Sequence, residues 1–212
     1  MRPGSIPTRG GMPVYSIKRG KCKTMDSAKR YIQENRERFV QELIGFLRIP
    51  SVSAKRERRE ACRQAAEFLL RELTRLGFTA KVHETPGNPI VTASRTDHPD
   101  QPTVLIYGHY DVQPEEPLDR WTAPPFEPRI ENGNLYARGA SDDKGQVYAH
   151  IKAVETLLQT GGKLPVNVIF LIEGEEEIAS THLDAFIDEQ RAMLRSDVAV
   201  ISDSSQFGPG VP

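Results

Sequence analysis

Apolar residues follow two different spacings along this chain, and each spacing predicts its own kind of element. Apolar positions at helical spacing predict helices over about 26–48, 58–76, 144–160 and 181–194. Short apolar runs between turn residues predict strands over about 79–84, 90–94, 104–109, 166–172 and 198–202. Asn132-Gly133 predicts a hairpin that joins 127–131 to 135–138.

Strands that are separated by helices indicate an α/β fold. We expect a mixed, mostly parallel sheet with helices on both faces. Residues 166–172 form an almost unbroken apolar, β-branched run, which is typical of a central strand that is covered on both sides. The segment 115–128 is too rich in proline for a helix, and we expect an ordered loop that Trp121 and Phe126 hold in place.

The first 24 residues differ in composition from the rest of the chain. They contain basic residues, prolines and glycines but no acid and no apolar core of a signal peptide. We therefore expect residues 1–24 to form a disordered basic tail, either a true leader or the product of an upstream start. Residues 25–212 are expected to form one folded unit.

The overall composition excludes several classes of protein. A net charge of −1 gives no basic field for nucleic acid, and no apolar run reaches the ~20 residues that span a membrane. Cys22 and Cys62 form neither a disulfide framework nor a zinc-ribbon spacing, which favours a reducing cytoplasm. The histidines outside residue 109 are expected to have no functional role: we place His83 and His98 on the surface, His182 at an exposed helix start, and His150 on a helix.

Chemically active side chains follow the carboxyl ends of several predicted strands and turns. These groups are His109 with Asp111, Asp142 with Asp143, the triplet Glu175–Glu177, and Asp203. In an open α/β sheet, ligands bind outside the carboxyl ends of the strands, so folding would gather one imidazole and several carboxylates. Two carboxylates about 4 Å apart repel by roughly 4 kcal/mol at an effective dielectric constant of 20. A divalent cation such as zinc would relieve this repulsion and suits these ligands.

Three motifs make this interpretation specific. The sequences GHYDVQP at 108–114, YARGASDDKG at 136–145 and IEGEEE at 172–177 resemble the metal-binding motifs of the co-catalytic zinc metallopeptidases. This family includes carnosine and cytosolic dipeptidases, glutamate carboxypeptidase, aminoacylase, acetylornithine deacetylase and succinyl-diaminopimelate desuccinylase. The resemblance extends over residues 25–212. The DVQP sequence and the loop with Trp121 most resemble the dipeptidase branch.

The resemblance implies two divalent metal ions, most simply zinc, with manganese or cobalt as other possibilities. It implies four metal ligands: His109 and Asp203 on one metal, Glu177 on the other, and Asp142 as the bridge. It also implies that Asp111 orients His109 and that Glu176 is the general base. In the family, the bond between Asp142 and the next residue is a cis peptide.

The reaction that the resemblance implies is hydrolysis of a peptide bond in dipeptides or short peptides by a water that two metals bridge. Two alternatives remain open. One is deacylation of N-acyl amino acids, as in the deacetylase and desuccinylase branch. The other is a non-catalytic metal-binding fragment.

The chain departs from the family pattern in two places. Ala179 stands where the family has a glycine. The sequence also stops at Pro212, whereas the family takes a further histidine ligand and a lid and dimerisation domain from later residues. We therefore expect an amino-terminal portion of a catalytic domain, with weak or no activity by itself. A homodimer is expected only where the lid domain is present.

Overall fold

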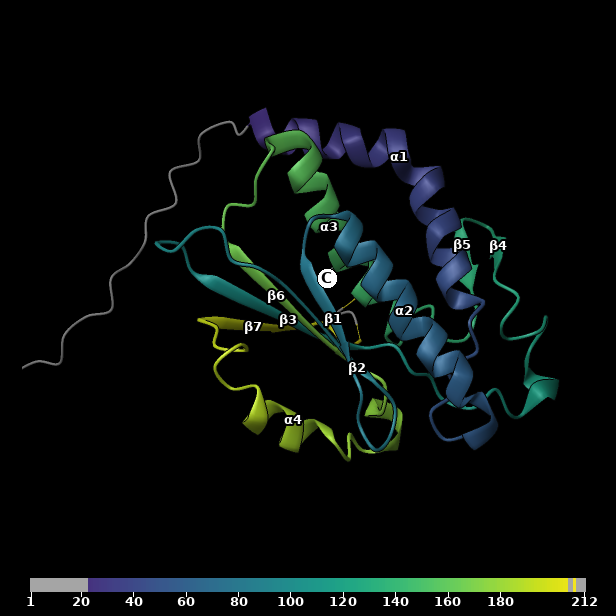
Figure 1. The fold of residues 1–212 in the computed structure, drawn as a ribbon. Helices are drawn as coiled ribbons and strands as arrows, with labels where there is room; N and C mark the ends of the chain where they lie inside the picture. The colour runs from purple at the N-terminus through teal and green to yellow at the C-terminus, as the bar shows by residue number, and fades with distance from the viewer. Residues whose placement is uncertain (1–22, 206–207, 209–212) are drawn as a thin grey trace, which may run out of the picture.

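The computed structural model describes residues 23–205 and 208, and five of its strands form one sheet. Figure 1 shows this sheet. The order across the sheet is β1-β2-β6-β3-β7. The strands are β1 (Thr79–His83), β2 (Ile90–Arg95), β3 (Thr103–His109), β6 (Asn167–Glu173) and β7 (Val198–Ile201). The expectations for residues 1–22 lie outside the described residues.

The sheet is mixed, as predicted, with two parallel and two antiparallel strand pairs rather than a parallel majority. β1 pairs with β2 and β2 with β6 in antiparallel orientation, whereas β3 pairs in parallel with both β6 and β7. All seven residues of β6 are buried, which confirms a central strand covered on both faces. β3 and β6 run side by side and end together, with His109 opposite Glu173. Side chains beyond these two strand ends therefore meet at one edge of the sheet.

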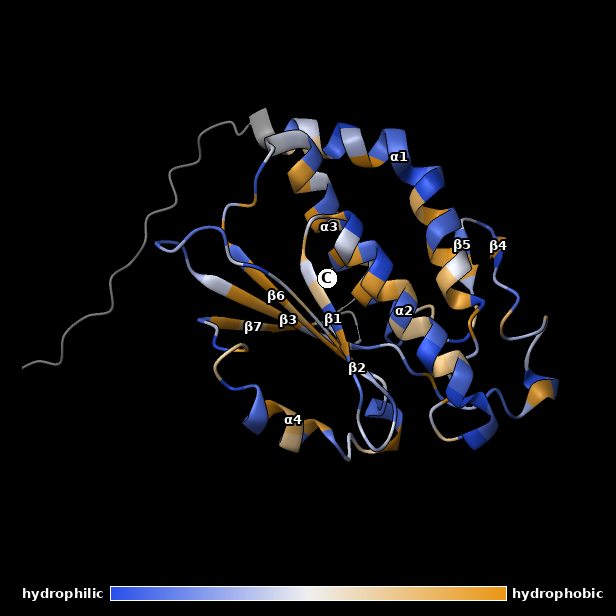
Figure 2. Cartoon of the chain, viewed as in Figure 1, coloured by the Kyte–Doolittle hydropathy of each residue, from blue (hydrophilic) through white to orange (hydrophobic). Residues whose placement is uncertain are grey.

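Helices cover the two faces of the sheet (Figure 1). α1 (Lys23–Leu47), α2 (Arg59–Arg75) and α3 (Lys144–Gly161) lie on one side, and α4 (Leu183–Glu189) lies on the other. The larger core fills the space between β6 and the first three helices, with Leu69, Ile151 and Phe170 among its buried members. Figure 2 shows the apolar residues of the sheet strands between these layers. Among the described residues, no helix combines the length and apolar character that a membrane span needs.

Several elements differ from their predicted lengths. α1 begins at Lys23, ahead of the expected start at about residue 26. Neither Lys23 nor Thr24 is a glycine or proline that would end the helix there. α4 covers only Leu183–Glu189 of the predicted 181–194, since the chain turns after Gln190 towards β7. The hairpin forms at the predicted turn, with the shorter strands β4 (Arg129–Glu131) and β5 (Asn134–Tyr136). Short 3-10 turns occupy Arg56–Arg58, Leu118–Arg120 and Glu176–Ile178.

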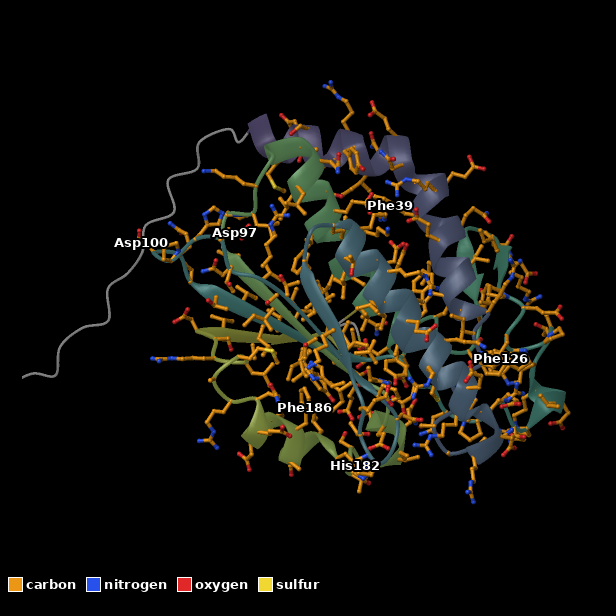
Figure 3. All side chains as sticks on the ribbon, viewed as in Figure 1. Phe39, Asp97, Asp100, Phe126, His182 and Phe186 are labelled. Atoms are coloured by element: carbon orange, nitrogen blue, oxygen red, sulfur yellow. The ribbon has the colours of Figure 1, made fainter. Side chains whose placement is uncertain are left out.

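Two local expectations have different outcomes. The indole N–H of Trp121 donates to the Glu115 carbonyl at 2.9 Å, which confirms that this side chain holds the proline-rich loop. His83, which was expected on the surface, is half-buried on the edge strand β1. Its ring packs edge-on against Phe186 of α4 at 4.9 Å between centroids and contacts the Thr92 hydroxyl. Phe186 faces the sheet in Figure 3, and its ring packs against one side of His83.

A cluster of charged side chains joins the three helices on one face of the sheet. Its members are three glutamates and three basic residues: Glu42, Glu72, Glu155, Arg38, Arg75 and Lys152. Glu155 lies at its centre with a side chain that is 2% exposed, and it contacts Arg38, Arg75 and Lys152. Because the acids carry their own countercharges here, this cluster is an ion-pair network and needs no metal ion.

Glu155→Gln removes the central negative charge of this network and tests its contribution to stability. Although burial opposes it, hydrogen bonding from Arg38, Lys152 and Arg75 lowers the pKa of Glu155 to about 2 from 4.5. Because the lowered pKa shows that the folded protein favours the ionised acid, loss of this buried charge should lower the free energy of unfolding by about 3 kcal/mol at pH 7. Urea denaturation measures this change.

The same variant has a pH signature. A folded-state pKa below the unfolded value gives stability that is present above pH 4.5 and is lost as the pH falls towards 2. Glu155→Gln should flatten this part of the stability profile. The exposed Glu67 of α2 offers a matched control, for which Glu67→Gln should change stability by less than about 0.5 kcal/mol. Equal losses in the two variants would contradict a role for the network.

Candidate metal centre

His109 ends β3 and points its imidazole at three carboxylates. The ring is fully buried, and its Nε2 lies 3.2 Å from Asp142 Oδ1, 3.5 Å from Asp203 Oδ2 and 3.8 Å from Glu176 Oε2. Nε2 nevertheless has no hydrogen-bond partner. A buried ring nitrogen without a partner is costly unless a ligand completes its environment.

The ligand atoms of His109, Asp142 and Asp203 lie within 4.8 Å of one another. They come from the end of β3, the turn before α3, and the residues just after β7. The chain thus brings together residues that are 94 positions apart in sequence, as the strand-end argument predicted. One imidazole nitrogen and two carboxylate oxygens around a small space fit a divalent cation such as zinc.

Asp111 contacts both His109 and the backbone of the turn that carries Glu176 and Glu177. His109 Nδ1 lies 3.0 Å from the Asp111 carbonyl oxygen and 3.3 Å from its carboxylate. That carboxylate also accepts the backbone N–H groups of Glu176 at 3.2 Å and Glu177 at 3.1 Å. One buried side chain therefore fixes the imidazole and the 3-10 turn that carries both glutamates.

Glu177 lies beside the three-residue cluster rather than in it. Gln113 donates its backbone N–H and its side-chain amide to the two Glu177 oxygens, at 3.1 and 2.6 Å. Burial raises the pKa of Glu177, with a further contribution from the negative charge of Asp142. Gln113 was not among the candidate site residues, although it stands inside the DVQP motif.

The turn before α3 has an unusual backbone. The Asp142–Asp143 peptide bond is cis, as the resemblance implied. Asp143 is buried, and its Oδ2 accepts the backbone N–H of His109 at 3.1 Å. Burial raises the pKa of Asp143 to about 7. Gly108 makes room for this contact, because a Cβ at residue 108 would lie 2.5 Å from Asp143 Oδ2.

Lys144 follows this turn and is completely buried. Its ammonium donates to the carbonyls of Ile49 at 2.6 Å and Phe46 at 3.3 Å, near the end of α1. Burial lowers the pKa of Lys144 to about 7. Nearby, the Ser51 hydroxyl donates to the Tyr110 carbonyl at 2.7 Å. The start of α3 and the end of β3 are therefore both tied to the segment after α1.

The three consecutive glutamates have different environments. Glu175 is buried and accepts the backbone N–H of Asn88 at 2.9 Å, and its other oxygen lies 2.6 Å from His182 Nδ1. His182 stands at the start of α4, as expected, and its side chain is 30% exposed although it contacts this acid. Glu175 thus holds the loop between β1 and β2, whereas Glu176 faces His109.

Residue 179, at which this chain has alanine and the family has glycine, adopts a backbone conformation that favours glycine. Ala179 has φ = 73° and ends the 3-10 turn in the left-handed region, which favours glycine. The sequence thus retains the backbone conformation without the residue type that adopts it most easily.

Electrostatics at the site couples metal binding to proton release. Burial disfavours the charged imidazolium, but hydrogen bonding to Asp111 and the surrounding negative charges outweigh this and raise the pKa of His109 to about 10. A metal ligand must be the neutral imidazole, so a cation that binds here would displace a proton.

Comparisons with known proteins agree with this geometry. The model of Peptidase family M20/M25/M40 matches residues 105–208, the part that holds all six candidate residues. The Cys-Gly metallodipeptidase dug1 of Schizosaccharomyces pombe is 33% identical over 202 residues, which is 89% of this chain and 42% of that protein. The human Beta-Ala-His dipeptidase is 35% identical over 206 residues, or 88% and 40% of the two chains.

Solved structures give the same result. The crystal structure of human carnosine dipeptidase 1 superposes with a TM-score of 0.81 at 32% identity, covering 85% of this chain and 41% of that one. The structure of the di-peptidase Dug1p from Saccharomyces cerevisiae gives a TM-score of 0.80 at 30% identity, covering 87% and 42%. The chain therefore spans about two fifths of the length of these relatives. It belongs to the M20 peptidase family and matches that family's dipeptidase branch.

Proposed function

We propose that this chain forms the metal-binding part of a catalytic domain that hydrolyses dipeptides or short peptides. The observation that carries the proposal is the buried, unpartnered Nε2 of His109 amid the carboxylates of Asp142, Asp203 and Glu176. The names of the related proteins support the dipeptide substrate class.

His109, Asp142 and Asp203 would hold one divalent ion, most simply zinc, and Glu177 with Asp142 would contribute to a second. Such ions, when bound, lower the pKa of a coordinated water and polarise the scissile carbonyl. The donor set is imidazole and carboxylate without thiolate, which suits zinc and also accommodates manganese or cobalt.

Glu176 is the proposed general base. Its carboxylate is 37% exposed and lies next to the three-residue cluster, so it can meet both solvent and a bound substrate. Glu175 is committed to Asn88 and His182, and Glu177 to Gln113, which leaves Glu176 as the member of the triplet that can take a proton. Its backbone N–H is fixed by Asp111, so the side chain starts from a defined position.

The experiment that tests this proposal measures metal binding and hydrolysis together. Wild-type chain should bind Zn²⁺ in equilibrium dialysis, and His109→Ala should abolish that binding. In buffer with Zn²⁺ or Mn²⁺ we expect weak dipeptide hydrolysis. Glu176→Gln should lower it by about 10²–10⁴-fold while metal binding is retained, because only the proton acceptor is lost.

The outcomes separate the alternatives. Metal binding with hydrolysis that Glu176→Gln leaves unchanged would refute the role of the base and favour a non-catalytic metal-binding protein. A panel of dipeptides against N-acetyl and N-succinyl amino acids would identify a deacylase by its preference for the acyl substrates. Vigorous turnover of dipeptides by the 212-residue chain would show that no further histidine ligand is needed.

Asp111→Asn tests the proposed link between the imidazole and the glutamate turn. The amide keeps the size of the side chain but removes its charge and one of the two acceptor oxygens that hold Glu176 N and Glu177 N. We expect the affinity for Zn²⁺ to fall by about 10–100-fold. Asp119→Asn is a matched control in an exposed turn and should leave the affinity unchanged. Equal affinities in all three proteins would contradict the link.

A further inference from the structure

Asp142 and Asp203 both lie beyond regular structure, which raises the question of what fixes their separation. Pairing between β3 and β7 ends at Tyr107 and Ile201, so Asp203 stands two residues past the last pair. Asp142 lies in the bend before α3, and its side chain is 57% exposed. Neither carboxylate is held in place by the sheet itself.

Helix α3 contacts the residue that precedes each of these acids. The side-chain amide of Gln146 donates to the carbonyl of Ser141 at 2.5 Å. One turn further along, His150 Nε2 lies 2.8 Å from the Ser202 hydroxyl. Residues four apart share one face of a helix, so the two side chains lie one above the other.

The residues that Gln146 and His150 contact lie beside the metal cluster. Ser141, Asp142, Gln146, Ser202 and Asp203 all line one open hollow of about 1100 Å³ beside the metal cluster. Burial lowers the pKa of His150, so the neutral ring adds no positive charge next to the ligand carboxylates at neutral pH. We expected no functional role for His150 from the sequence, and helical spacing gives no sign of its partner 52 positions later.

We propose that Gln146 and His150 are positioning residues that set the separation of Asp142 and Asp203 for metal binding. Each acts through a serine: Gln146 restrains the backbone at Ser141, and His150 restrains the side chain of Ser202. Both serines are bonded directly to a ligand residue, so loss of either contact lets one carboxylate move away from His109. This inference rests on the proposed metal site.

The test is the affinity for Zn²⁺, measured by competition with a chromophoric chelator, in the 212-residue chain. Gln146→Ala and His150→Ala should each weaken binding by about tenfold, the lower end for groups that orient metal ligands. His150→Gln should recover most of that loss, since its amide reaches where Nε2 lies. Two residues whose side chains have no described partner give controls: the exposed Gln159 on α3 and the half-buried His98 on a loop. Gln159→Ala and His98→Ala should keep wild-type affinity.

A double-mutant cycle identifies the contact itself. If His150 acts through Ser202, then Ser202→Ala should weaken binding as much as His150→Ala, and the double variant should be no weaker than either. A merely structural role would lower the melting temperature without this pattern and without rescue by His150→Gln. Affinities within twofold of wild type for Gln146→Ala and His150→Ala would overturn the inference.

The proposed function fails in a different way. If the wild-type chain binds no Zn²⁺, or if the Asp142→Asn variant binds Zn²⁺ equally well, the metal site is refuted and the inference is refuted with it. If wild-type chain binds Zn²⁺ and Asp142→Asn does not, equal affinity in the Gln146 and His150 variants refutes the inference alone.

Discussion

The Asp111 carboxylate joins two parts of the chain that are 65 positions apart, and the geometry of the candidate metal centre depends on this junction. A buried carboxylate is expensive to desolvate unless hydrogen bonds satisfy it. Two backbone N–H groups and the imidazole of His109 do so here. The same contacts place Glu176 Oε2 3.8 Å from His109 Nε2. The hydrogen bonds that satisfy the Asp111 carboxylate therefore also hold Glu176 beside His109.

The acidic side chains at this edge of the sheet have no lysine or arginine partners among the described residues, whereas those between α1, α2 and α3 are paired with basic residues. There, Glu155 and its two companion glutamates meet Arg38, Arg75 and Lys152 at salt-bridge distance. At the metal centre the carboxylates have only an imidazole between them, with no lysine or arginine within salt-bridge distance among the described residues. The two clusters contain similar acids, and their countercharges distinguish a structural network from a site that accepts a cation.

Local patterns were enough to predict most of the fold and the convergence of His109, Asp142 and Asp203. Apolar runs located the strands, and the carboxyl ends of the parallel strands β3, β6 and β7 share an edge, which accounts for the approach of His109 and Asp203. Asp142 reaches the same place from the turn before α3. Contacts made across the tertiary structure were invisible to such patterns. Glu175 looked like its neighbours, yet Asn88 and His182 make it structural. His83 lay at a polar strand end, yet Phe186 of α4 packs against it.

Gly108 shows how narrow the room around this centre is. The carboxylate of Asp143 occupies the space that a side chain at residue 108 would need, and a Val147 methyl group approaches equally closely, at 2.5 Å from the Cβ position. The identities of residues 108 and 143 are consequently coupled through volume rather than through chemistry. A related chain that acquired even a methyl group at the first position would have to shorten or displace the acid at the second.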